Sequence, residues 1–409
     1  MKSPVAWSEI GRHGALPQAT HDEVARFNVI ANLNAFLAQR LAPTVGAAYE
    51  RRAMPAWRAR QGRAPVDRHE VHEAIASDPA YRAWSALRRN TMEMRQQAGR
   101  SLVLRQARDL QERVAALNAG SARLHLDPSL PIPRYLSAVD THLMPGGYTG
   151  VGQDDALSNA ANYDAGFFAT VGGSGGPWND GAGRALVAWL REHYPQFQPD
   201  RIVDLGCGLG HNTLPLRAAY PDAVIVAIDV AAPMLRYGHA RARSLGVDDV
   251  EFRQEDAMQT SLASGSCDFV FTTMVLHETS HEALPRLFAE ARRLLRPGGL
   301  TIHLEQPPFR GMEPFEQFMR DWDGRYNNEP FWSALHESSL PALLREAGFA
   351  PQCVFESECA APRAGAAGDV DGPEDFGRAP QWYAAGAWQV AATGRAPGSQ
   401  SLETRPLET

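Results

Sequence analysis

The chain has 409 residues, of which 44% are hydrophobic and 21% charged, a composition typical of globular proteins and long enough for two domains. Its apolar runs are too short to span a bilayer and its first residues lead into no signal-type apolar segment. We therefore expect a cytoplasmic protein that does not enter a membrane. The four cysteines form no Cys-x-x-Cys pair, which argues against a zinc site and a disulfide framework.

Positive charge is concentrated in the first third of the chain. Residues 1–126 carry 19 Lys or Arg and 11 Asp or Glu, a net charge of +8, whereas the whole chain carries −7. Basic segments can bind nucleic acid, but here the arginines are interleaved with acids at helical spacing. We therefore interpret them as a solvated helix face and expect no nucleic-acid partner, although one or two arginines could reach an anionic substrate.

The first 125 residues are predicted to form an all-helical N-terminal domain of four or five helices. Apolar residues recur at intervals of three and four, which indicates amphipathic helices, and Thr20 is a suitable N-cap for the first of them. The predicted helices cover residues 21–41, 71–75, 81–94 and 102–117. Prolines at 128, 131 and 133 then discourage a continuing helix and predict a linker.

Residues 126–180 contain this linker and two aromatic, glycine-rich segments, 145–150 and 163–168. After them, residues 181–194 are predicted to form a helix that leads into a strand–turn sequence. The apolar strand at 202–205 contains Asp204 and enters a turn that contains Gly206, Cys207, Gly208 and Gly210. Glycines allow positive φ and leave no Cβ between the backbone and a ligand, so this turn predicts a nucleotide-cofactor site.

A second strand at 224–229 ends in Asp229, which is placed to bind a ribose diol. A dinucleotide fingerprint would place a glycine or alanine three residues after Gly208, where this chain has His211. Asp204 would repel a pyrophosphate but suits a ligand with an ammonium group and no phosphate, such as S-adenosylmethionine. Further strands are predicted at 250–252, 267–273 and 300–304, and Asp256 and Ala257 follow the first of these.

With these motifs in this order, residues from about 180 to 395 resemble the class I S-adenosylmethionine-dependent methyltransferases, in particular the small-molecule type related to ubiquinone and menaquinone biosynthesis. The resemblance implies an α/β fold, a Rossmann-like doubly wound seven-stranded sheet at 181–395, with a disordered tail at 396–409. It assigns Asp204 and the turn residues Gly206, Cys207, Gly208 and Gly210 to the methionine part, Asp229 to the ribose, Val230 to the adenine face, and Asp256 with Ala257 to the adenine edge.

Two further segments are predicted to complete the site. In similar enzymes an aromatic segment closes over the cofactor, and Tyr148 or Tyr163 could contact the sulfonium by a cation–π interaction or simply pack the domain junction. Helices at 313–326 and 331–347 carry many aromatic residues and are predicted to form a substrate lid, or to bury those residues against each other. The last strands are predicted at 354–355 and 388–393.

Methyl transfer from a sulfonium needs positioning and, for a protonated oxygen or nitrogen acceptor, a base, but no metal. His277 and Glu278 follow the fourth predicted strand and Glu305 follows the fifth, so all three are candidate catalytic residues. We expect His277 to be the general base, with a pKa of about 6 to 7, and Glu278 or Glu305 to bind a basic or hydroxylated part of the substrate. Other candidates are His281, His303, Asp321 and His336.

The sequence therefore predicts transfer of a methyl group from S-adenosylmethionine to an oxygen, nitrogen or carbon atom of a small metabolite. One alternative is cyclisation of the cofactor itself, with release of methylthioadenosine, and another is a binding module without catalysis. An RNA or protein methyltransferase is disfavoured because no acceptor-amine motif follows the fourth strand and no RNA-binding motif is present. The acceptor and the oligomeric state are left open, with a homodimer as one option.

Overall fold

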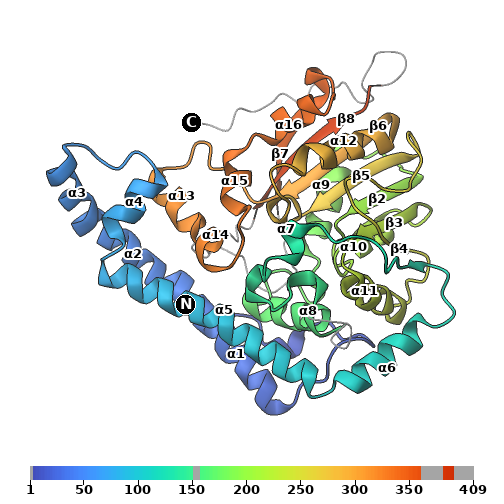
Figure 1. Ribbon diagram of the computed structural model, residues 1–409, viewed down its shortest axis with the longest axis horizontal. Helices are drawn as coiled ribbons and strands as arrows, with labels where there is room; N and C mark the ends of the chain where they lie inside the picture. Colours follow the sequence, from blue (N-terminus) through green and yellow to red (C-terminus); the bar gives the residue numbers. More distant parts are fainter. Residues whose placement is uncertain (1–2, 151–156, 361–380, 391–409) are drawn as a thin grey trace.

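The computed structural model describes residues 3–150, 157–360 and 381–390. Its centre is a mixed eight-stranded sheet in the order β1-β4-β3-β2-β5-β6-β8-β7 (Figure 1). The strands are β1 (Leu124–His125), β2 (Arg201–Leu205), β3 (Val224–Asp229), β4 (Glu251–Gln254), β5 (Cys267–Thr273), β6 (Leu295–Glu305), β7 (Val354–Ala360) and β8 (Gln381–Trp388). The strand order reverses between β2 and β5, the point at which doubly wound sheets bind ligands.

The predicted α/β, Rossmann-like doubly wound fold is confirmed. Strands β1 to β6 pair in parallel, and β8 and β7 add an antiparallel edge. The prediction of seven strands is exceeded by one because Leu124–His125, at the end of the predicted helical domain, forms a strand that pairs with β4. The last strand begins at 381 instead of 388, and residues 391–393 of the predicted strand lie outside the described residues.

Apolar side chains cover both faces of the sheet. Along β2, Ile202 joins one buried cluster and its neighbour Val203 joins another, because successive strand residues point to opposite faces. The first cluster includes residues of helices α9 (Gly181–His193), α10 (Thr213–Ala219) and α11 (Ala232–Ser244). The second includes residues of α12 (Leu284–Leu294) and α16 (Leu340–Glu346). All seven residues of β5 are buried, which is typical of a central parallel strand.

The N-terminal residues form helices, as predicted, and lie along one side of the sheet domain (Figure 1). These are α1 (His21–Phe36), α2 (Ala42–Ala48), α3 (Met54–Gln61), α4 (Arg68–Ile75), α5 (Pro79–Leu104) and α6 (Ala107–Asn118), with single π-helical turns at Leu37–Leu41 and Tyr49–Ala53. Thr20 is the predicted N-cap of α1 and forms a capping box with Glu23. The predicted helix at 81–94 is part of the longer α5.

The aromatic insertion after β6 forms short helices rather than the two that were predicted. They are α13 (Pro314–Arg320), α14 (Trp322–Tyr326) and α15 (Trp332–Glu337), followed by α16. Phe318 and Trp322 share a buried cluster with Tyr81 and Trp84 of the N-terminal helices. The Trp322 indole also donates a hydrogen bond to Ser85 Oγ at 2.8 Å. Phe318 and Trp322 of the insertion are therefore buried against the N-terminal helices.

Helix α8 (Ser158–Thr170) was not predicted, yet it links the N-terminal helices to the sheet domain. It is buried along almost its whole length and contacts α1, α5 and α11. Gly99 of α5 faces Asn162, and an added Cβ there would lie 1.8 Å from the amide oxygen. The described part of residues 126–180 also contains α7 (Arg134–Ser137). The division into domains at residues 125, 180 and 395 stays a prediction, and the tail lies outside the described residues.

Close contact between α11 and the glycine turn depends on Gly238. A Cβ at this position would lie 2.8 Å from the carbonyl oxygen and 2.9 Å from the carbonyl carbon of Leu209, which are backbone atoms that cannot turn away. We predict that Gly238→Ala destabilises the protein by about 1 to 3 kcal/mol, the usual cost of overpacking, although alanine is the better helix former. Chemical denaturation measures this effect. Arg236→Ala on the same helix is the control, and equal stability of the two variants would contradict the prediction.

Candidate active site

A pocket of about 360 Å³ lies at the carboxyl ends of β2, β3 and β5. Its wall combines the glycine turn of the sheet domain with residues of α5, α8 and the aromatic insertion. Eleven of the predicted site residues line it: Tyr148, Tyr163, Gly206, Cys207, Gly208, Asp229, Val230, Asp256, Ala257, His277 and Glu278. Asp204, Gly210 and Glu305 do not line it.

The glycine turn leaves one side open to the pocket. Gly206, Gly208 and Gly210 have φ angles of +78°, +52° and +70°, which residues with a Cβ rarely adopt. A Cβ on Gly208 would meet no atom within 4 Å, so the absence of a side chain there leaves space for a ligand. A Cβ on Gly210 would instead lie 3.2 Å from the Phe252 ring, so the glycine lets the turn pack on β4.

Asp229 fastens the glycine turn to the end of β3. Its Oδ2 atom accepts a hydrogen bond from the Gly208 N–H at 2.8 Å, and its Oδ1 atom accepts one from the Ala231 N–H at 2.8 Å. Burial raises the pKa of this carboxyl group, although these backbone N–H groups oppose the rise. Because each carboxylate oxygen has a second lone pair, Asp229 can still accept hydrogen bonds from two ligand hydroxyls in the pocket.

Asp204 lies beneath the pocket and is almost completely buried. Its Oδ2 atom accepts a hydrogen bond from Thr213 Oγ1 at 2.6 Å, whereas its Oδ1 atom has no donor among the described residues. Burial raises the pKa of Asp204 to about 7, with a further contribution from Asp229, while Thr213 opposes the shift. A cationic group near Oδ1 would stabilise the ionised carboxylate.

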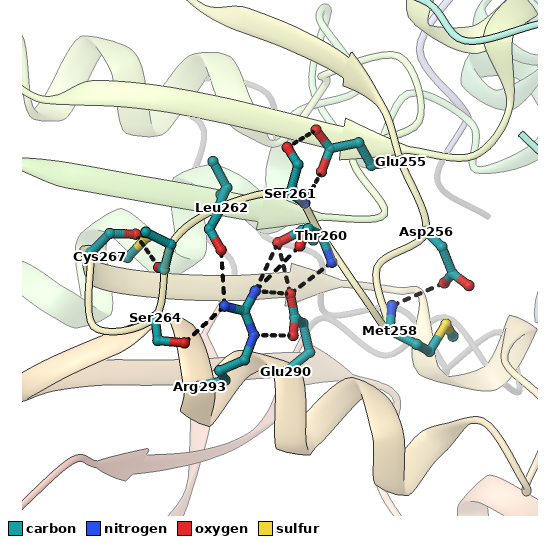
Figure 2. Close-up of polar contacts among 12 residues, drawn as sticks. Glu255, Asp256, Met258, Thr260, Ser261, Leu262, Ser264, Cys267, Glu290 and Arg293 are labelled. Carbon is teal, nitrogen blue, oxygen red and sulfur yellow. Dashed lines mark hydrogen bonds and ion pairs between the residues drawn. The ribbon is translucent and has the colours of Figure 1, made fainter.

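The loop after β4 is held in place by α12. As Figure 2 shows, Arg293 reaches from the helix to the loop, and its guanidinium donates to the Leu262 carbonyl at 2.9 Å and to Ser264 Oγ at 3.0 Å. The neighbouring Glu290 accepts hydrogen bonds from the backbone and hydroxyl of Thr260 at 2.8 and 2.7 Å. At the pocket end of this loop, Asp256 accepts a hydrogen bond from the Met258 N–H at 2.9 Å. The loop therefore presents Asp256 and Ala257 in a fixed conformation.

A buried carboxylate from α8 closes the other side of the glycine turn. Asp164 contacts His13 Nε2, His211 Nε2 and the Tyr237 hydroxyl, each at 2.8 Å. Burial opposes ionisation of Asp164, but His13 and His211 lower the pKa of the carboxyl group well below its ordinary value. His211, which occupies the position of the third glycine in a dinucleotide site, therefore connects the turn to α8.

His277 is held by Glu305. The Nδ1 atom of the imidazole lies 2.8 Å from Glu305 Oε2, while the other oxygen of Glu305 accepts a hydrogen bond from the Leu276 N–H at 2.7 Å. This pairing leaves Nε2 directed toward Glu278, with its Oε1 atom 3.8 Å away. Because Glu305 is completely buried and does not line the pocket, it is a positioning residue for His277 rather than a group that touches substrate.

His142 was not predicted, but it joins two carboxylates of the pocket. Its Nε2 atom lies 3.1 Å from Glu278 Oε1, and its Nδ1 atom lies 3.0 Å from Glu329 Oε1. Tyr148 also donates a hydrogen bond to Glu278 Oε1 at 3.0 Å. His142 has a φ angle of +54°, an unfavourable conformation for a side chain of this size, which the surrounding contacts maintain.

The charges in this cluster stabilise one another. Burial lowers the pKa of each histidine, but Glu329 and Glu278 together raise that of His142 to about 10, and Glu305 raises that of His277 to about 9. Conversely, His142 overcomes the effect of burial on Glu329 and lowers its pKa to about 2. The expectation that His277 titrates between about 6 and 7 is therefore wrong, because it did not include the buried carboxylates.

The remaining candidates lie outside the pocket. His281 is exposed, and His303 is buried between Thr272 and Thr301, where burial lowers its pKa to about 3. Asp321 pairs with Arg68, and His336 contacts the Pro307 carbonyl. Tyr163, in contrast, lines the pocket, and its ring stacks on Phe167 with ring centroids 5.6 Å apart. Within the described ranges, no group of three or more His, Cys, Asp or Glu could hold a metal ion, and no helix is long and apolar enough to cross a membrane.

Comparisons with known proteins find similarity in the region that contains the glycine turn. Residues 202–299 match the family model described as a methyltransferase domain. The chain is 38% identical over 117 residues to a malonyl-[acyl-carrier protein] O-methyltransferase of Methylococcus capsulatus, covering 29% of this chain and 40% of the relative. It is 35% identical over 165 residues to a trans-aconitate 2-methyltransferase of Methylobacterium nodulans, covering 40% of this chain and 58% of the relative.

Among solved structures, the chain is similar to geranyl diphosphate C-methyltransferase from Streptomyces coelicolor A3(2). The TM-score is 0.37 with 18% sequence identity, over 50% of this chain and 79% of the other. The chain spans about 40% to 58% of the lengths of the two curated relatives. The similarity to those relatives therefore concerns the methyltransferase domain, where it confirms the family resemblance seen in the sequence.

The histidine pKa values predict how stability depends on pH. An unfolded histidine titrates near about 6.5, whereas folded His277 and His142 titrate at about 9 and about 10. Between the unfolded and the folded pKa values, the folded protein binds more protons than the unfolded chain. The contribution of the two histidines to stability is therefore complete below about pH 6.5 and is lost as the pH rises through about 9 to 10. We expect the melting temperature to fall across this range, and less steeply in His142→Gln. The exposed His21→Gln is the control, and identical slopes in all three proteins would contradict the prediction.

Proposed function

Because residues 202–299 match a methyltransferase domain, we propose that the protein transfers a methyl group from S-adenosylmethionine to an oxygen, nitrogen or carbon atom of a small metabolite. The observation that carries the proposal is that one pocket adjoins both this domain's glycine turn and a cluster of buried acid–base groups. The cofactor would supply a methyl group on a sulfonium sulfur. The protein's own task is then to position the acceptor, exclude water and accept a proton where the acceptor carries one.

The residues on the sheet side of the pocket fit this cofactor. The open space at Gly208 would receive the methionine part, and the unpaired Oδ1 atom of Asp204 would attract its ammonium group from beneath. Asp229 would accept hydrogen bonds from the ribose hydroxyls, and Val230 would pack on the adenine face. Asp256 and Ala257 would contact the adenine edge, while Tyr148 and Tyr163 would lie near the sulfonium.

On the acceptor side, His277 is the proposed general base. Glu305 orients its imidazole so that Nε2 faces the pocket, and the neutral form needed to accept a proton is abundant only above a pH of about 9. Glu278 would bind a donor group of the acceptor. The buried Trp332 ring, 5.1 Å from the His277 ring in an edge-on arrangement, keeps water from this side of the imidazole.

The domain match and the methyltransferase relatives favour methyl transfer over cyclisation of the cofactor and over an inactive binding module. We further infer a small-molecule acceptor, without nucleic-acid or membrane partners, and a cytoplasmic location. A homodimer stays a prediction, which light scattering of the purified protein would test.

The cofactor assignment predicts that S-adenosylmethionine and S-adenosylhomocysteine raise the melting temperature and that NAD does not.

Asp229→Ala should weaken binding of S-adenosylhomocysteine by about 1.5 to 3 kcal/mol, because it removes charge-assisted hydrogen bonds to the ribose. Isothermal titration calorimetry measures this change. Asp222→Ala, an exposed residue just before β3, should leave affinity unchanged. Equal affinities of the two variants would exclude the proposed role of Asp229, and preferential binding of NAD would overturn the cofactor assignment.

The assignment of the base predicts that turnover rises with pH through a pKa near 9. His277→Ala should lower turnover by about a hundredfold and lose this pH dependence, while affinity for S-adenosylhomocysteine changes little. His277→Gln, which keeps a donor for Glu305, separates loss of the base from loss of the fold. His281→Ala at an exposed position is the control. A pH profile in His277→Gln that equals that of the unmodified protein would reject His277 as the base.

A further inference from the structure

We infer that the acceptor molecule carries a protonated amino group, which binds against Glu329 and Asn327 in the pocket. Both residues line the pocket, and both are more than nine-tenths buried, with exposed fractions of 3% and 6%. They follow α14 in the aromatic insertion, on the side of the pocket that also contains His142 and Glu278. The inference rests on the proposed methyl transfer, because that proposal defines which side of the pocket binds the acceptor.

Two buried oxygen atoms at this position accept no hydrogen bond from the described residues. Glu329 Oε1 contacts His142 Nδ1 at 3.0 Å and accepts a hydrogen bond from Asn327 Nδ2 at 2.7 Å, but Glu329 Oε2 has no donor. Asn327 Oδ1 also has no donor. An ionised carboxylate can only accept hydrogen bonds, so the Asn327 amide nitrogen must face Glu329 and its oxygen must point elsewhere. An isolated buried acceptor is costly, so both oxygens indicate a ligand with N–H or O–H donors.

Charge decides between these donors. The cluster contains three carboxylates, Glu278, Glu305 and Glu329, and two histidines, His142 and His277. Even with both imidazoles protonated, one negative charge is left in excess. A ligand with one positive charge would neutralise it, a hydroxyl would not, and a carboxylate would add a second negative charge in a region of low dielectric constant.

The other charged groups of the pocket wall bind partners outside this cluster. Asp323, which also lines the pocket, pairs with Arg88 at 2.9 Å, so the pair is neutral. Arg95, another cation of the pocket wall, donates from Nε to Thr170 Oγ1 on α8 at 3.0 Å. His336 contributes no charge, because burial lowers its pKa to about 4. Aromatic rings of Tyr148, Tyr163 and Trp332 line the same pocket, and such rings attract ammonium groups.

The cofactor's sulfonium is the other cation that could balance Glu329, and the two cases differ in a measurable way. S-adenosylhomocysteine lacks this positive charge. If Glu329 faced the sulfonium, Glu329→Gln would weaken binding of S-adenosylmethionine but not of S-adenosylhomocysteine. If Glu329 faces an acceptor amine, the substitution changes both affinities equally or not at all.

The test uses the full-length protein saturated with S-adenosylhomocysteine and probes that differ in one group: benzylamine, benzyl alcohol and benzoate. Binding at millimolar concentration is followed by calorimetry and by the melting temperature. We expect benzylamine to bind at least tenfold more tightly than the other two, and Glu329→Gln to remove this preference. Glu313→Gln, at an exposed position of the same insertion, is the matched control.

Three results would overturn the inference: equal or weaker binding of benzylamine compared with benzoate, no binding of benzylamine, or a benzylamine preference that survives in Glu329→Gln. Failure of the proposed function has a different signature, since the unmodified protein would then not bind S-adenosylhomocysteine at all. Should Glu329→Gln fail to fold, Asn327→Ala is the second variant. It removes the Asn327 Oδ1 atom and keeps every ionisable side chain, and the preference for benzylamine should decrease.

Discussion

The interaction on which the site depends is the buried carboxylate of Asp164. A carboxylate removed from water is stable only when its oxygens are fully hydrogen-bonded, and here two histidines and a tyrosine provide the contacts. They come from the N-terminal segment, the glycine turn and α11, so this one group fixes α8 against three other parts of the chain. Removing any partner would leave a buried charge unsatisfied, which makes the arrangement specific as well as stable.

This constraint explains why the pocket is not a property of the sheet domain alone. The glycine turn, Asp229 and the loop held by Glu290 and Arg293 form its cofactor side from strands that are close in sequence and paired in parallel. Its acceptor side is assembled from distant segments. α8 and α5 provide one wall, and the segment before α8 contributes His142 and Tyr148. The insertion after β6 packs on the N-terminal helices and contributes Glu329.

The acceptor side is also where the structure concentrates charge. Burying several ionised groups together costs desolvation energy, which direct ion pairs partly offset. The arrangement in return fixes the orientation of His277 and His142 before any ligand arrives, and such preorganisation favours catalysis. The same pairs move the histidine pKa values far from those of free imidazole, so the protonation of both histidines depends on the neighbouring glutamates.

Most strands and the glycine turn could be predicted from the sequence, because they depend on local signals: apolar runs, glycines that need positive φ, and acids at strand ends. Asp229, Gly208 and Asp256 were found in this way and line the pocket. The sequence did not predict α8, because a helix buried on all sides has no polar face and shows no amphipathic period. Only the tertiary structure brought His142 and Glu329, 187 residues apart in sequence, into contact. Nothing local marks either residue except a short polar run at 327–329, and the shifts of both pKa values depend on that contact.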